Sequence, residues 1–225
     1  MKDFTKFWFL NDFNLFKKIG KNSLMQMSHL LDMINIKKGE TLFLTREDKE
    51  VVYFLKSGTI KIVNSEKDYV RSILNAGNLF GELTLYNDGY NDVKEEKAIV
   101  LEDGVVCVIE TKEMKMMLEK YGSLKNQLLK INGIRIRKLQ RNLEDLLYKD
   151  SRTRIKEYIL SYINQFGIEK DGMVKAKNLL SHKDIAQLTS TSRQTVSNVM
   201  SELRKEGVVD YNTTELKVSL KSNSV

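Results

Sequence analysis

The sequence predicts an α+β fold in three parts: an N-terminal antiparallel β-roll, a long helix and a C-terminal winged helix-turn-helix. Three observations predict it. Short apolar runs separated by glycine-containing turn signals fill residues 37–110. Apolar residues recur at alternating spacings of three and four along residues 124–148. After Gly207 the hydrophobic period changes from that of helices to that of strands. We expect the three parts to span residues 1–122, 123–148 and 149–225.

The composition is that of a globular chain with a basic excess. At 41% apolar and 30% charged, the 225 residues can bury the cores of two modest domains. The net charge of +7 favours polyanionic partners. No apolar run approaches the length of a membrane span, and charges interrupt the aromatic N-terminus, which lacks a small-residue cleavage site. We therefore expect a cytoplasmic protein with no membrane partner.

A single cysteine restricts the chemistry of the chain. One thiol forms no intrachain disulfide and no four-thiolate iron–sulfur or zinc site within one chain. Cys107 lies in an apolar run, which favours a buried structural thiol over a redox sensor. The roll has no histidine between Lys37 and Glu110 and no compact cluster of metal ligands. The sequence therefore predicts no metal site and argues against an enzyme carried by the roll.

Residues 1 to about 36 are predicted to be helical, because apolar residues recur at helical spacing after a candidate N-cap, Asn22 or Ser23. These are Leu24, Met27, Leu30, Leu31 and Ile34. From Lys37 the apolar runs fall at 42–44, 51–55, 60–63, 70–74, 99–101 and 105–109. Turn signals separate them at 38–40, 57–59, 76–78, 87–89 and 102–104. Many short strands punctuated by glycine turns predict an antiparallel roll.

A short helix from Thr111 leads into the long helix, which carries a seam with one polar member, Asn132. The seam consists of Leu129, Asn132, Ile136, Leu139, Leu143 and Leu146. A second apolar set, Leu128, Ile131 and Ile134, is expected to pack on the roll. Two apolar faces on one helix predict a parallel homodimer through the seam, the alternative being a core helix within one chain. The seam stops near Lys149, where Asp150 is the candidate N-cap of a helix over 152–164.

Residues 181–207 are predicted to form two helices joined by a tight turn. The first spans about His182 to Thr189, with the hydroxyl of Ser181 as its cap. The second begins at Thr191 or Ser192, with Gln194 as the return partner of a capping box from Thr191.

The second helix has one apolar and one polar face. The apolar face consists of Val196, Val199, Met200 and Leu203. The polar face carries Gln194, Asn198 and Ser201, flanked by Arg193, Ser197 and Arg204. Arginine reads guanine, asparagine and glutamine read adenine, and serine reads either, whereas an ordinary solvated helix carries interspersed glutamate and lysine. This face therefore predicts a DNA-reading helix, the alternative being an ordinary helical pair.

The residues expected to contact DNA lie on and just before this helix. They are Thr191, Ser192, Arg193, Gln194, Thr195, Ser197, Asn198 and Ser201, with Lys183 from the first helix. Candidates for phosphate contacts are Lys175, Lys177, Lys183, Arg204 and Lys205. Two strands around the turn 212–214 follow, with Val208, Val209 and Tyr211 on one side and Leu216, Val218 and Leu220 on the other. This hairpin is a lid on the small core, a wing that contacts phosphate, or both.

Several motifs resemble those of the Crp/Fnr superfamily of bacterial transcription regulators, and the resemblance covers nearly the whole chain. The most specific is Thr191-Ser192-Arg193-Gln194-Thr195-Val196. The others are Leu79-Phe80-Gly81-Glu82-Leu83, Leu55-Lys56-Ser57-Gly58 and Lys38-Gly39-Glu40. The resemblance implies a cyclic-nucleotide-binding-like roll and a dimer that binds a palindromic double-stranded operator. It also implies a small-molecule effector and, for an activator, contact with RNA polymerase.

The expected effector pocket departs from the family pattern. It comprises Phe80, Gly81, Glu82, Leu83, Glu96 and Lys97 of the roll, with Arg135 and Leu139 of the long helix. Members that bind a cyclic nucleotide carry an Arg-Ser or Arg-Thr where Glu96 and Lys97 stand. A carboxylate there repels a phosphate, and lysine replaces the bidentate arginine only as a point charge. Leu139 and Gln140 replace the adenine-contacting Thr-Ser. Cyclic AMP is therefore disfavoured as the effector.

No cofactor is expected. Haem needs axial ligands, and outside the DNA-binding helices the chain offers only His29, methionines or Cys107. The alternative is a cyclic-nucleotide- or haem-dependent regulator of the same fold, and an unrelated small molecule, a redox change and constitutive activity also stay open. In the second helix, family members with a well-known operator carry Glu at Gln194 and Arg at Asn198, so a half-site shifted toward A·T is expected.

The expected mechanism is allosteric: a signal in the roll shifts the pairing of the long helices and the angle at Lys149 to Asp150. Two recognition helices then move into or out of a spacing of about 34 Å. The rival reading is a sequence-nonspecific architectural DNA-binding protein.

Overall fold

The computed structural model describes residues 10, 13, 15–43, 45–46, 49–81 and 96–219, and the chain divides into two compact units, Met1–Arg137 and Lys138–Val225. The predicted fold class is confirmed: an antiparallel sheet domain is followed by a long helix and a helix-turn-helix domain with its own small sheet. The long helix, α4 (Gly122–Tyr148), contributes residues to both units.

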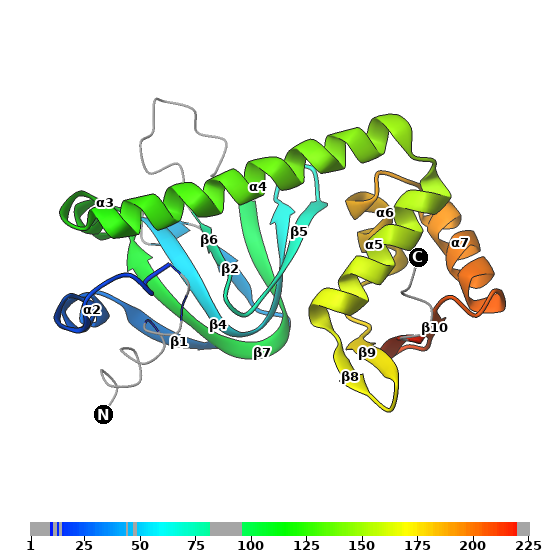
Figure 1. Ribbon diagram of the computed structural model, residues 1–225, viewed down its shortest axis with the longest axis horizontal. Coiled ribbons are helices and arrows are strands. Elements are labelled where there is room, and N and C mark those ends of the chain that lie inside the picture. The colour runs from blue at the N-terminus through cyan, green and yellow to red at the C-terminus, as the bar shows by residue number, and fades with distance from the viewer. Residues whose placement is uncertain are drawn as a thin grey trace. The chain divides into compact units, whose positions relative to one another are not determined.

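The first unit is a curved antiparallel sheet capped by helices (Figure 1). Its two long strands, β4 (Lys49–Asn64) and β7 (Glu96–Glu110), pair along most of their length. Strands β1 (Asp32–Ile36) and β2 (Thr41–Phe43) extend the sheet from β7. On the other side, β3 (Thr45–Arg46), β5 (Tyr69–Asn75) and β6 (Leu79–Gly81) pair with β4.

Alternation along β4 divides the core of this unit in two, because successive side chains of a strand point to opposite faces. Val51, Tyr53 and Leu55 enter the interior of the roll, where they pack with apolar residues of β7. Val52 and Phe54 point the other way, against α2 (Lys21–Ser28), α3 (Thr111–Lys120) and the first turns of α4. Cys107 is buried in this second cluster, as the sequence predicted.

Three expectations for the sheet and the helix before it are wrong. The helix begins at Lys21 after Gly20, with no side-chain cap, and not after Asn22 or Ser23. The helix expected to continue through Ile34 ends at Ser28, and residues 32–36 form β1, paired with residues 104–108 of β7. The signals at 57–59 and 102–104 are not chain-reversing turns; they are irregularities inside β4 and β7, where the register shifts. Gly58 has φ of +93°, and a Cβ on Gly104 would lie 2.0 Å from the carbonyl oxygen of Ser57. The glycines there permit a sharp bend and a close backbone approach within a strand.

The second unit is a winged helix-turn-helix built on α5 (Ser151–Phe166), α6 (His182–Leu188) and α7 (Arg193–Lys205). Asp150 caps α5 as predicted, its carboxylate accepting from the amide of Thr153 at 2.7 Å. The sheet has four strands in the order β10-β11-β9-β8: β8 (Ile168–Lys170), β9 (Met173–Lys177), β10 (Asp210–Tyr211) and β11 (Glu215–Ser219). The predicted hairpin is present as β10 and β11; Leu220 lies outside the described residues, and β8 and β9 were not predicted.

None of the helices described in the structure is both long and apolar enough to cross a membrane.

Candidate nucleic-acid interface

The turn between α6 and α7 is fixed by local hydrogen bonds. A capping box begins α6: the amide of Asp184 donates to Ser181 Oγ at 3.1 Å, and the amide of Ser181 donates to the Asp184 carboxylate at 2.9 Å. After Thr189 the backbone enters the left-handed region at Ser190, with φ of +52°. The amide of Thr191 then returns to the carbonyl of Ala186 at 2.8 Å.

The N-cap of α7 is Ser192, whose Oγ accepts from the amide of Thr195 at 3.0 Å. The predicted capping box from Thr191 to Gln194 is therefore wrong by one residue. Thr191 turns its hydroxyl to that of Thr189, 3.0 Å away. With Ser192 as the cap, the Gln194 side chain is released from the helix end and points along the helix to Asn198.

The two faces of α7 are those the sequence predicted. Val196, Val199, Met200 and Leu203 are buried. On the other face the structure exposes Ser192, Arg193, Gln194, Asn198 and Ser201, and leaves Thr191, Thr195 and Ser197 half-buried. Lys183 is exposed on α6. The predicted DNA-contacting residues of α7 therefore form one solvent-accessible polar surface, which we call the reading face.

Within the reading face the side chains differ in what they already bind. Gln194 Nε2 donates to Asn198 Oδ1 at 2.9 Å, and the hydroxyls of Ser192 and Thr195 lie 2.8 Å apart. Within the described residues Arg193 has no hydrogen bond or ion pair. The three other arginines of the winged domain, Arg152, Arg154 and Arg204, are all bonded. The guanidinium of Arg193 thus keeps its five donors for an outside acceptor.

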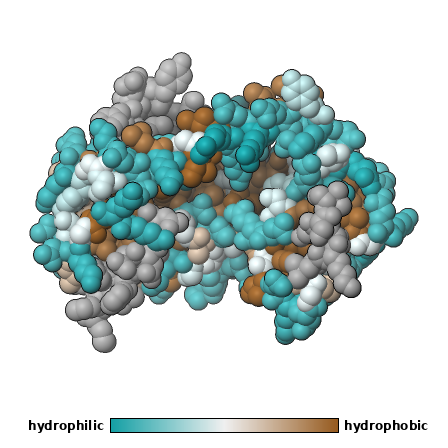
Figure 2. Space-filling model, in the orientation of Figure 1, coloured by the Kyte–Doolittle hydropathy of each residue, from teal (hydrophilic) through white to brown (hydrophobic). Residues whose placement is uncertain are grey.

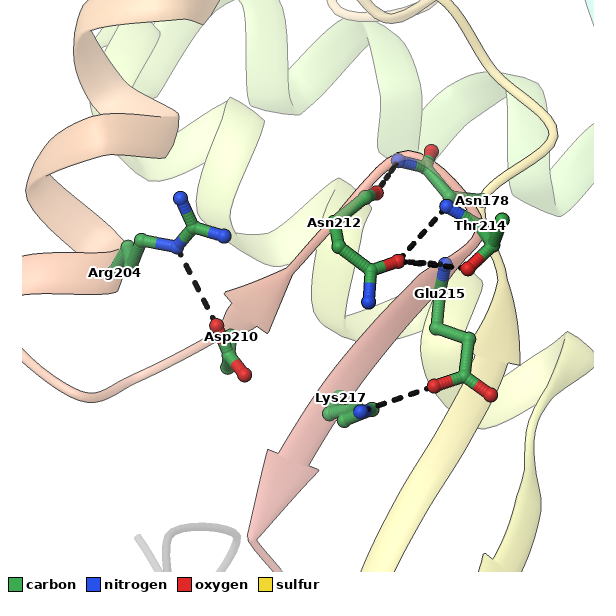
Figure 3. A network of polar contacts seen from close by, with 7 residues as sticks. All are labelled: Asn178, Arg204, Asp210, Asn212, Thr214, Glu215 and Lys217. Atoms are coloured by element: carbon green, nitrogen blue, oxygen red, sulfur yellow. Dashed lines mark hydrogen bonds and ion pairs between the residues drawn. The ribbon is translucent and has the colours of Figure 1, made fainter.

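Arg204, one of the candidates for a phosphate contact, already has partners within the domain. Its guanidinium lies 4.2 Å from the ring centroid of Tyr211. Its Nε is 3.4 Å from the Asp210 carboxylate (Figure 3). These contacts join the end of α7 to β10, so in this structure Arg204 holds the wing against the recognition helix. Of the other phosphate candidates, Lys177, Lys183 and Lys205 are exposed and Lys175 is half-buried.

The wing turn is tightly bonded (Figure 3). Asn212 Oδ1 accepts from the amides of Thr214 and Glu215, both at 2.8 Å, which is the Asx pattern typical of asparagine in turns. Asn178 clamps the same turn from the end of β9: its Nδ2 donates to the carbonyl of Asn212 at 2.7 Å and its amide to the carbonyl of Thr214 at 2.8 Å. These hydrogen bonds hold the wing turn in one conformation without a bound partner.

In the roll, the structure describes part of the expected effector pocket. Phe80 is buried and stacks on Tyr53 with ring centroids 4.8 Å apart. Gly81 has φ of +107°, and a Cβ there would lie 2.3 Å from the carbonyl oxygen of Val51, so glycine is required. Glu82 and Leu83 lie outside the described residues. Glu96 forms an ion pair with Arg71 of β5, and Lys97 is half-buried.

Arg135 of α4 belongs to the same region. Its Nη2 donates to the carbonyl of Leu79 in β6 at 2.6 Å, and burial lowers the pKa of its guanidinium. The structure thus brings Arg135 to the strand that carries Phe80 and Gly81. Leu139, expected in the same pocket, has a side chain that is 66% exposed.

The seam of α4 is exposed in the single chain. Leu129, Ile136 and Leu143 are 60%, 56% and 59% exposed, and Leu139 and Leu146 are exposed as well. Asn132 is half-buried. Hydrophobic residues reach the surface at several points along α4 in the space-filling view (Figure 2).

The second apolar set of α4 packs on the roll only in part. Leu128 is buried in the core beneath α4, and Ile131 packs against it at the edge. Ile134 is 50% exposed, so the expectation that it packs on the roll is wrong. The contact with the core therefore ends about one turn earlier along the helix than the sequence pattern suggested.

Two family models match the chain in the order of its two units. Residues 33–121 match the cyclic nucleotide-binding domain, and residues 153–220 match the Crp-like helix-turn-helix domain. The chain belongs to the Crp/Fnr superfamily of transcription regulators. The resemblance seen in the motifs around Phe80 and Arg193 is thereby confirmed.

Curated relatives and solved structures agree with this assignment to the Crp/Fnr superfamily. The chain is 29% identical over 187 residues to the Anaerobic regulatory protein of Bacillus subtilis, covering 80% of this chain and 78% of the relative. It is 22% identical over 196 residues to the CRP-like cAMP-activated global transcriptional regulator of Mycobacterium tuberculosis, covering 86% of each.

Among solved structures, FixK2 from Bradyrhizobium japonicum superimposes with a TM-score of 0.69 at 17% identity, covering 85% of this chain and 93% of that one. A cyclic nucleotide-binding domain containing protein from Listeria monocytogenes gives 0.67 at 15% identity and 99% coverage of both chains. At these identities the superpositions support the fold.

Sequence reasoning missed three residues of this Crp/Fnr chain that shape the interface: Arg154, Asn178 and Asn212. Asn212 stood in a predicted turn, where an Asx contact is the ordinary signal. Asn178 and Arg154 carried no comparable signal, because the turn residues that they contact lie 34 to 36 residues away in the sequence.

Proposed function

We propose that this chain is a homodimeric, sequence-specific DNA-binding regulator that the roll controls through an effector other than cyclic AMP. The observation that carries the proposal is the reading face of α7. Its opposite face is buried, its two amides and the hydroxyls of Ser192 and Ser201 are exposed, and Arg193 has no partner within the described residues. Such a face suits the major groove, where arginine pairs with guanine and an amide with adenine.

The exposed seam of α4 supports the dimer. A row of four leucines and one isoleucine that is 45–66% exposed is costly in water, and a second copy of the same row would cover it. A parallel pair places two recognition helices at one end, as a palindromic operator requires. Asn132, the polar member of the seam, then fixes the register of the two paired helices.

The charges of the roll support an effector that is not a cyclic nucleotide. Where relatives that bind one carry arginine, Glu96 is a carboxylate already paired with Arg71. An incoming phosphate would meet the carboxylate without a free guanidinium on that strand to neutralise it.

We propose no cofactor and no enzymatic activity for the chain, and we propose that it acts in the cytoplasm. RNA polymerase is a further partner if the protein activates transcription.

The test is selection of binding sites from a randomised double-stranded DNA library with the purified protein, followed by anisotropy titration of the selected duplex. A regulator selects a defined inverted repeat, and Arg193→Ala loses roughly tenfold or more in affinity for it, since a good base contact is worth about 1–3 kcal/mol. Ser201→Ala, on the same face, serves as a milder control. Equal affinity for selected and random duplexes, with a steep salt dependence, would instead indicate an architectural DNA-binding protein.

Isothermal titration calorimetry with cyclic AMP tests whether the effector is this cyclic nucleotide. We expect no heat of binding at concentrations up to the millimolar range. Saturable binding that Arg135→Ala removes would overturn the proposal for the effector while leaving the DNA-binding proposal intact.

A further inference from the structure

One guanidinium in the winged domain connects two segments that sequence reasoning treated separately. Arg154, in the first turn of α5, donates to three backbone carbonyls. Its Nη1 donates to Lys149 at 2.6 Å, its Nε to Thr189 at 3.1 Å and its Nη2 to Ser190 at 3.2 Å. The first carbonyl lies at the end of α4, and the other two lie in the turn that leads into the recognition helix.

The turn needs these donors. The carbonyls at the end of a helix have no partner within the helix, and a cation near them is favourable. Thr189 is the C-cap of α6, and Ser190 adopts a left-handed conformation that costs a residue other than glycine about 1–2 kcal/mol. Arg154 supplies hydrogen bonds to both carbonyls, so it stabilises the conformation that sets where α7 begins.

Arg154 and its neighbours also stabilise the junction between α4 and α5. The ammonium group of Lys149 lies 2.6 Å from Asp145 of α4 and 2.5 Å from Glu157 of α5, so one side chain spans both helices. The hydrogen bonds that Lys149 donates to the carboxylates of Asp145 and Glu157 also raise its pKa. The Asp150 cap and the hydrogen bond from Arg154 to the Lys149 carbonyl stabilise the same junction.

We propose that Arg154 is a positioning residue that holds the end of α4, the start of α5 and the helix-turn-helix turn as one rigid body. The angle at Lys149 to Asp150, which the sequence suggested as the place of allosteric change, then stays fixed. A signal that moves the recognition helices has to act before Lys149, along α4 or its seam. This inference rests on the proposed function only for its DNA-binding readout.

The test compares Arg154→Met with Arg152→Met by amide hydrogen exchange of the full-length protein. Arg152 lies two residues earlier on the same helix and pairs with Glu206 and Glu202, so it is a matched control for loss of an arginine. The reporters are the amides of Thr189 and Thr191 in the turn, and those of Lys149 and Thr153 at the junction.

In Arg154→Met we expect both pairs of amides to exchange faster by about ten- to a hundredfold, the range for loss of hydrogen bonds to a charged group. In Arg152→Met they stay within about threefold of the wild type. Faster exchange confined to the turn, or to the junction, would refute the single rigid body. If Arg154→Met fails to fold, Arg154→Lys keeps the charge but lacks the planar fork that reaches three carbonyls, and it is read in the same way.

A second variant separates the two roles of Arg154. Ser190→Gly removes the cost of the left-handed residue, so added to Arg154→Met it should restore slow exchange in the turn and leave the junction fast. Affinity for a selected operator should fall in Arg154→Met by about tenfold and recover in part with Ser190→Gly. Unchanged affinity together with faster exchange would overturn the positioning role, whereas loss of all sequence preference in the wild type would count against the proposed function alone.

Discussion

The hydrogen bond between Gln194 and Asn198 predicts that these two residues read DNA as one unit. The amide oxygen of Asn198 has two lone pairs, of which Gln194 Nε2 occupies one at 2.9 Å. The second lone pair and the Nδ2 donors remain for the N6 and N7 positions of an adenine. Gln194 therefore holds the Asn198 amide in the orientation that the base requires.

The expected losses of base preference follow from the energies of these contacts. An exposed amide pair one turn apart contributes about 0.2–0.5 kcal/mol to a free helix, whereas a bidentate base contact contributes about 1–3 kcal/mol of discrimination. Asn198→Ala should therefore lose roughly 1–3 kcal/mol of preference for A·T over G·C at one half-site position. Gln194→Ala should lose part of the same preference, because Asn198 is then free to rotate.

The double mutant should lose less than the sum of the single mutants, with a coupling of about 0.5–1 kcal/mol, in the range measured for residues in contact. The assay is anisotropy titration of the four proteins against duplexes that differ at that one position. Lys205→Ala combined with Asn198→Ala is the control pair and should be additive, because Lys205 is exposed two turns further along the helix. Additivity within about 0.3 kcal/mol for Gln194 and Asn198 would show that they act independently.

Three further predictions follow from the described contacts. Ile136→Asp places a charge in the exposed seam and should convert a dimer to a monomer by native mass at micromolar concentration, a dimeric mass refuting that use of the seam. The amide of Thr153 lowers the pKa of Asp150, so the stability that Asp150 contributes is present above the ordinary carboxyl range of about 4 and is lost as the pH falls through the lowered value. Melting curves of Asp150→Ala and the wild type should therefore converge in acid. Arg204→Met should loosen the wing, seen as faster amide exchange at Thr214 and Glu215, while affinity falls by less than for Arg193→Ala.

Where the sequence predicted the fold well, the signal was local. The spacing of Leu129, Ile136 and Leu143 identified the long helix, and the two faces of α7 followed from the positions of its apolar residues. Where prediction failed, one residue type served two purposes. Glycine marks both chain reversals and bulges, so Gly58 and Gly104 suggested turns where two long strands bend together.

Local sequence patterns could not predict the shortest strands or the contacts between residues that lie far apart in the sequence. The three residues of β8, Ile168–Lys170, are all exposed, so no alternation marks them as a strand. The pairing of Glu96 with Arg71 and the bonds of Arg154 to Thr189 and Ser190 join residues 25 to 36 positions apart. The type of residue in the reading face was therefore predictable from the sequence, while the contacts that orient it required the fold.

The most direct test of the account is the form of the DNA site that the wild-type protein selects from a randomised duplex library. A dimer that presents Arg193, Gln194 and Asn198 twice should select two inverted half-sites whose centres lie about one helical turn, or roughly 34 Å, apart. A guanine should face Arg193 and an adenine should face the Gln194–Asn198 pair. Selection of a single unrepeated half-site, or of no consensus at all, would contradict the account.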